Sequence, residues 1–118
     1  MKLAIIVREE TMLRCTGSGC MNAFFQRLDS FARYRDCDEV ELVAFTHNGG
    51  DLEKKIATLK KKAVDVVHLS SCIRGKDPNY EALARRLSED FAVVGYTHGG
   101  EVGGTGPAII LEKASSCR

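Results

Sequence analysis

A turn that carries two cysteines and two glycines is the part of this sequence best suited to chemistry. The stretch Arg14–Cys20 reads Arg-Cys-Thr-Gly-Ser-Gly-Cys and follows an apolar run, Leu3–Val7, that is typical of a β-strand. A helical pattern begins near Met21, so backbone N–H groups and a helix dipole at this turn favour negative charge. A thiolate placed here would be stabilised, and a stabilised thiolate is a nucleophile or a metal ligand.

Other reactive side chains follow the later predicted strands. Sulfur, imidazole or carboxylate comes after each of the four predicted strands in turn, as Cys15 and Cys20, then His47 and Asp51, then Cys72, then His98. The carboxyl ends of parallel strands share one edge of a sheet, and ligands bind at that edge. Thiolate and imidazole suit zinc, iron–sulfur clusters or other soft to borderline metals. The pattern predicts a metal site, with zinc as the default metal and iron–sulfur as an alternative.

The elements that would position these side chains alternate between strand and helix. Runs that are apolar on nearly every residue predict the strands Leu3–Val7, Glu41–Phe45, Val64–Leu69 and Phe91–Tyr96. A first helix is expected from about Met21 through Arg33, with Phe24, Phe25, Leu28 and Phe31 in the core. A second helix follows Asp51 as N-cap. A third is expected to start at Asp77-Pro78, after a loop that covers 73–76.

Fully apolar strands separated by amphipathic helices indicate a mainly parallel sheet covered on both faces. The handedness of the crossovers favours an α/β three-layer sandwich with four or five strands, flavodoxin-like or Rossmann-like. At 118 residues the chain is expected to be a single domain, 1–118. Within it, 99–118 would hold a Gly-rich loop, Gly99–Gly106, and a tail in which Ala108–Leu111 is a strand or part of a helix.

Composition excludes several classes of function. The formal net charge is +1, and no run of like charge is longer than Lys60–Lys62, so we expect no binding to nucleic acid or to an anionic membrane. No apolar run has the length of a membrane span, and Met1-Lys2 leads directly into a strand, so a cytoplasmic location is expected. Five cysteines without a secretion signal argue against a disulfide framework and for metal ligands or catalytic thiols.

The chain resembles the CGGC-domain family over about 1–98. The resemblance rests on the Arg-Cys-x-x-x-x-Cys turn at Arg14–Cys20, on Phe24-Phe25, on the His-Leu-Ser-Ser-Cys run at His68–Cys72 and on Thr97-His98-Gly99. It implies a small α/β domain that binds metal through cysteines and histidines. Where the family has Cys-Gly-Gly-Cys, this sequence has Asn48-Gly49-Gly50-Asp51.

Carried over by position, the family's thiols remain at Cys15, Cys20 and Cys72, whereas Asn48 and Asp51 replace two others. His47 and Asp51 could serve as substitute ligands and would give a harder site. Catalysis, if it occurs, would use metal-activated water or thiol redox chemistry. His68 lies inside a strand, which favours a hydrogen-bonded core histidine.

Two alternatives stay open. The turn Thr16, Gly17, Ser18, Gly19 is rich in glycine and hydroxyl groups and could hold a phosphate or a flavin, as in a flavodoxin-like module with a small anionic ligand. The chain could also be a degenerate, non-catalytic family member that acts through protein contacts alone.

Overall fold

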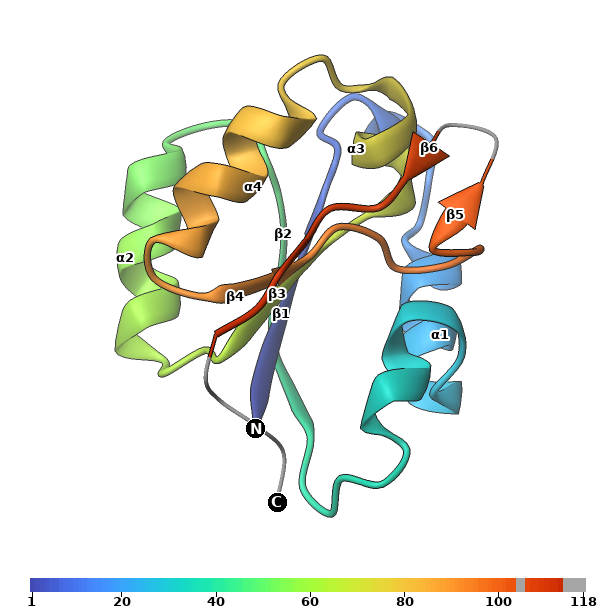
Figure 1. Ribbon diagram of the computed structural model, residues 1–118. Coiled ribbons are helices and arrows are strands. Elements are labelled where there is room, and N and C mark those ends of the chain that lie inside the picture. Colours follow the sequence, from blue (N-terminus) through green and yellow to red (C-terminus); the bar gives the residue numbers. More distant parts are fainter. Residues whose placement is uncertain (104–105, 114–118) are drawn as a thin grey trace.

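The first strand, β1 (Lys2–Val7), is buried from Leu3 onwards and lies at the centre of a sheet. In the computed structural model, which describes residues 1–103 and 106–113, five strands pair in the order β2-β1-β3-β4-β7. The partners are β2 (Glu41–His47), β3 (Val66–Leu69), β4 (Ala92–Val94) and β7 (Ile110–Leu111). The first four strands are parallel, and β7 runs antiparallel to β4 (Figure 1).

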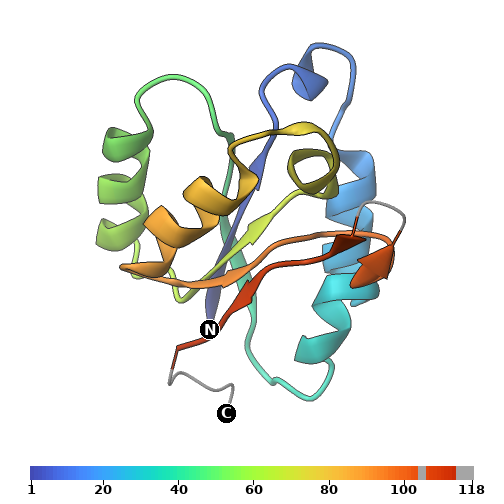
Figure 2. The ribbon, with the colours of Figure 1, turned by 45° about the horizontal axis from the view of Figure 1, so that its top comes forward.

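Helices cover both faces of this sheet. The helix α1 (Ser18–Gln26) and the 3-10 helix η2 (Asp29–Tyr34) lie on one face, and α2 (Leu52–Lys61) and α4 (Tyr80–Ser88) lie on the other (Figure 2). The predicted three-layer α/β sandwich is confirmed. The order β2-β1-β3-β4 also occurs in flavodoxin-like sheets, but the antiparallel β7 departs from a fully parallel flavodoxin sheet.

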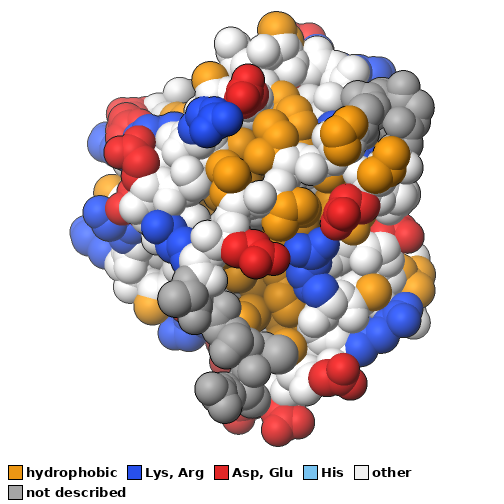
Figure 3. All heavy atoms as spheres, viewed as in Figure 1, with side chains coloured by type: hydrophobic (Ala, Val, Ile, Leu, Met, Phe, Trp, Pro, Cys, Tyr) orange, Lys and Arg blue, Asp and Glu red, His pale blue; other side chains and the backbone are white. Residues whose placement is uncertain are grey.

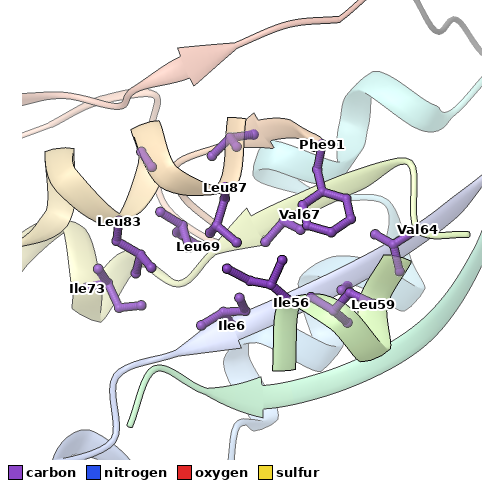
Figure 4. Close-up of a cluster of buried hydrophobic side chains, with 13 residues drawn as sticks. Ile6, Ile56, Leu59, Val64, Val67, Leu69, Ile73, Leu83, Leu87 and Phe91 are labelled. Atoms are coloured by element: carbon purple, nitrogen blue, oxygen red, sulfur yellow. The ribbon is translucent and has the colours of Figure 1, made fainter. Parts of the chain in front are cut away.

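The alternation of side chains along β1 divides the core into two parts. Ala4 and Ile6 pack with α2 and α4, in a cluster that includes Ile56 and Leu87 (Figure 4). Leu3, Ile5 and Val7 point to the opposite face and pack with α1 and η2. A strand that is buried on both faces needs an apolar residue at every position, which is why the sequence signal for β1 is so clear.

The first predicted helix is wrong in its length. The helix α1 ends at Gln26, because Arg27 takes a left-handed conformation with φ 55° and Leu28 is extended. The chain then continues as the separate helix η2, which buries Phe31. As a result Phe25, which was expected in the core, is 64% exposed.

The third predicted helix starts later than expected. The expected loop over 73–76 belongs instead to a short helix, α3 (Ser71–Lys76), and α4 begins only at Tyr80. Asp77 follows α3 and accepts a hydrogen bond from Asn79 N at 2.8 Å, so it shapes the link between two helices. The predicted cap Asp51 is confirmed, since its carboxylate accepts a hydrogen bond from Lys54 N at 3.1 Å.

The tail forms strands where it is described. A two-stranded ribbon, β5 (Val102–Gly103) and β6 (Gly106–Pro107), lies in the expected Gly-rich loop, of which residues 104–105 fall outside the described part. Tyr80 anchors β7: its hydroxyl donates to Gly95 O at 2.6 Å and accepts from Ile109 N at 2.9 Å.

Acidic and basic side chains alternate over the face of the molecule seen in Figure 3, around a strip of exposed hydrophobic atoms. Among the described residues, no helix has the length and apolar character needed to cross a membrane.

Removing the Tyr80 hydroxyl should weaken the attachment of β7. The Tyr80→Phe variant leaves a backbone N–H and a backbone C=O without their partner, so we expect a loss of about 2 kcal/mol in the free energy of unfolding. Urea titration measures this loss. The Tyr96→Phe variant is the matched control, because the structure gives the Tyr96 hydroxyl no hydrogen bond within the described residues. Equal losses in both variants would contradict the proposed anchor.

Candidate metal and thiol site

A pocket of about 340 Å³ opens at the carboxyl edge of the sheet, between the ends of β1 and β3. Its lining includes four of the six predicted metal ligands, Cys15, Cys20, Cys72 and His98, and we call it the thiol pocket. Strand order reverses at this point, because β2 lies on one side of β1 and β3 on the other. Doubly wound sheets bind their ligands at such a position.

Cys15 is the exposed thiol of this pocket. It lies between the short 3-10 helix η1 (Thr11–Leu13) and α1, and its Sγ accepts a hydrogen bond from Gly17 N at 3.3 Å. Gly17 is the N-cap of α1 with φ 79°, and a Cβ there would lie 2.8 Å from the Phe45 ring. Glycine is therefore required at this position for both conformation and space.

Cys20 is the buried thiol, in the first turn of α1. Its Sγ lies 3.1 Å from Thr97 Oγ1, which follows β4. Burial raises the pKa of the Cys20 thiol, the hydrogen bond with Thr97 lowers it in part, and the negative charges of Cys72 and Cys15 raise it further. Both of the other pocket thiols thus act electrostatically on Cys20.

Cys72 and His98 come from the ends of β3 and β4. The half-buried Cys72 is the second residue of α3, and its Sγ lies 2.7 Å from Ser70 Oγ. The His98 ring lies against Gly19, where an added Cβ would be 3.4 Å from the ring. Ser71 holds this segment in place, since its hydroxyl donates to His98 O at 2.6 Å.

The other two predicted ligands, His47 and Asp51, are engaged in the turn that follows β2. His47 Nδ1 accepts a hydrogen bond from Gly49 N at 3.0 Å and lies 3.7 Å from Glu9 Oε2. Asp51 caps α2. Neither residue lines the thiol pocket. Thr16 and Ser18 of the predicted phosphate-binding turn are exposed and also outside that lining, whereas Gly17 and Gly19 are part of it.

The donor atoms share a pocket but are not arranged around one point. Within residues 1–103 and 106–113, no three His, Cys, Asp or Glu side chains stand close enough together to hold a metal ion. The donor set of the thiol pocket, three thiols and an imidazole with no carboxylate in the lining, nevertheless has the chemistry that soft and borderline metals prefer. Of the remaining cysteines, Cys37 is disulfide-bonded, and Cys117 lies outside the described residues.

A model of the CGGC domain matches residues 2–98, most of the chain. The chain belongs to the CGGC-domain family. The searches of curated proteins and of solved structures found no match. In this CGGC-domain protein Asn48 and Asp51, at the two ends of the turn after β2, have structural partners. Asn48 accepts from Glu9 N at 3.0 Å and donates to Asp77 Oδ2 at 2.7 Å, and Asp51 caps a helix.

Two charged residues of the pocket were not predicted from the sequence. Arg14 and Lys76 line the thiol pocket and add positive charge beside the thiols. Arg14 directly precedes Cys15, which was a signal that could have been used. Lys76 gave no such signal, because its position depends on the unpredicted helix α3.

His68 is a hydrogen-bonded core histidine, as predicted. Ser30 Oγ donates a hydrogen bond to Thr97 O at 3.0 Å. Because the Ser30 proton is used there, Ser30 Oγ accepts a hydrogen bond from His68 Nδ1–H, also at 3.0 Å. The other ring nitrogen, Nε2, then accepts from Tyr34 OH at 2.7 Å. The ring stacks on Phe31 with centroids 4.2 Å apart. These partners satisfy the neutral imidazole, and burial lowers the pKa of His68 to about 3.

The buried neutral His68 should make the protein sensitive to acid. Between the ordinary histidine pKa of 6.5 and about 3, the unfolded chain binds a proton that the folded chain does not, so stability falls as pH is lowered through this window. We expect a loss of about 4 kcal/mol in the free energy of unfolding over the full window.

Urea titrations at several pH values measure this loss. His68→Gln, which keeps hydrogen-bonding atoms but does not titrate, should flatten the slope between pH 6.5 and 3. His47→Gln, a change of a partly exposed histidine, is the control and should keep the wild-type slope. A wild-type slope in His68→Gln would show that other groups cause the acid sensitivity.

Proposed function

We propose that this CGGC-domain protein binds a metal ion, zinc by default, through Cys15, Cys20, Cys72 and His98. The observation that carries the proposal is the meeting of three free thiols and one imidazole, from three separate strand ends, in one pocket. Three cysteines and one histidine form a donor set that zinc commonly uses. Membership in a family whose domain is named for its cysteines supports the same function.

Local side-chain rotation would have to bring the donors together. Cys15 is exposed and is held by a single hydrogen bond from Gly17 N, so its side chain can turn at low cost. The hydroxyls of Thr97 and Ser70, at 3.1 and 2.7 Å from the sulfurs of Cys20 and Cys72, can donate to thiolates and so orient them as ligands. A bound zinc ion would supply Lewis acidity or a structural cross-link.

Metal binding can be tested by chelator competition on protein purified without chelator. We expect one zinc ion per chain. Cys15→Ser, Cys20→Ser and Cys72→Ser should each weaken zinc affinity by about 100-fold or more, since even the loss of an outer-shell partner of a ligand costs 10–100-fold. His98→Ala should weaken it to a smaller extent, because water can take the fourth position.

The turn after β2 provides the controls. His47→Gln and Asp51→Asn remove the other two predicted ligands, and asparagine still caps a helix. Both variants should keep the wild-type zinc affinity. Zinc that binds weakly and is unaffected by the three serine substitutions would contradict the proposal. A loss of zinc affinity in His47→Gln or Asp51→Asn would show that the fourth ligand is His47 or Asp51 and not His98.

A further inference from the structure

Two cations at the thiol pocket have no counter-charge among the residues that the structure describes. Arg14 and Lys76 are both exposed and both line the pocket. Within the described residues, neither side chain makes a hydrogen bond or an ion pair. The lining contains no aspartate or glutamate. The pocket therefore presents unbalanced positive charge to any small molecule that enters it.

Arg14 is unusual among the arginines of this protein. Each other arginine in the described part of the chain bonds a carboxylate or a backbone carbonyl, namely Arg8, Arg27, Arg33, Arg35, Arg74, Arg85 and Arg86. Arg86, for example, bonds both Glu53 and Asp90. The absence of a protein partner at Arg14 coincides with its place beside the accessible thiol of Cys15.

Cys15 has the features of an accessible sulfur nucleophile. It is exposed, whereas Cys20 is buried and Cys72 half-buried. Gly17 N–H donates a hydrogen bond to its sulfur at 3.3 Å, which holds the side chain at the pocket. Thiolates attack disulfide sulfurs, so an accessible thiolate next to unpaired cations would react preferentially with disulfides that carry negative charge.

We propose that Cys15 is a modification site for anionic low-molecular-weight disulfides, of which glutathione disulfide is the probe. The Cys15 thiolate attacks one sulfur, a new S–S bond forms to Cys15, the original S–S bond breaks, and one thiolate leaves and takes up a proton. Carboxylates of the bound half pair with Arg14 and Lys76. The pocket volume of about 340 Å³ is within the range of about 300–1,000 Å³ common for small-molecule sites.

This inference goes beyond the metal proposal and does not depend on it. The two would compete in the cell, because a mixed disulfide removes Cys15 as a metal ligand. The experiment therefore uses metal-free protein, and zinc affinity is measured separately on the wild-type protein.

The test compares three disulfides of different charge: anionic glutathione disulfide, neutral 2-hydroxyethyl disulfide and cationic cystamine. Reaction is followed by intact mass and mapped by peptide mass spectrometry. It is carried out in a Cys20→Ser/Cys72→Ser background, so that no neighbouring pocket thiol removes the adduct. For each disulfide, the rate with the folded protein is divided by the rate with the same protein unfolded in urea. This ratio, the corrected rate, removes differences in the intrinsic reactivity of the three disulfides.

We expect the adduct on Cys15, and a corrected rate about tenfold higher for glutathione disulfide than for cystamine at low ionic strength. The preference should fade as salt is added, since charges separated by more than about 8 Å are screened at physiological ionic strength. Arg14→Gln/Lys76→Gln should bring the three corrected rates together.

Lys61→Gln/Lys62→Gln is the matched control. It removes the same charge from exposed lysines at the end of α2 that have no partners among the described residues. This variant should keep the preference. Equal rates for the three disulfides in the parent protein, or an adduct on a cysteine other than Cys15, would overturn the inference. A wild-type protein that binds no zinc, together with a persisting charge preference, would overturn only the metal proposal.

Discussion

The parallel pairing of β1 with β3 is the constraint on which the candidate site depends. In this register Leu3 pairs with Val66 and Ile6 pairs with Leu69. The carboxyl ends of the two strands therefore lie at the same level of the sheet. A backbone hydrogen bond from Ser70 N to Ile6 O, at 2.9 Å, continues this alignment into the turn. Cysteines that are more than fifty positions apart in the chain therefore reach one pocket, although no local motif connects them.

Within that pocket, burial gives the thiols different chemistry. Cys20 packs among core residues, where the low polarity raises its pKa and favours the protonated thiol. Cys15 faces solvent and accepts a hydrogen bond from a backbone N–H, and it directly follows Arg14, whose guanidinium has no partner among the described residues. A buried thiol such as Cys20 can serve as a metal ligand that loses its proton only when the metal binds. An exposed thiol such as Cys15 can serve as a nucleophile. One pocket can thus support both of the proposed activities, with Cys15 common to them.

The parts of this structure that the sequence predicted are those set by burial and topology. The strands were predictable because a strand covered on both faces must be apolar throughout, and the gathering of Cys15, Cys20, Cys72 and His98 followed from the shared edge. The end of α1 was missed because Arg27 takes its left-handed conformation without a glycine or proline to mark it. The isolation of Arg14 could not be predicted, since ion pairing depends on where every other side chain lies.

The turn after β2 and the thiol pocket are built from different parts of the chain. Asn48 joins Glu9 N to Asp77, and Asp51 caps α2, so both residues stabilise local structure. The pocket itself is built from residues that follow β1, β3 and β4, and it has no lining residue from 48–51. The two sets of residues follow different strands, so the contacts of the turn after β2 are separate from the register that gathers the thiols. The turn after β2 is therefore structural, while the three thiols lie where the strand order reverses.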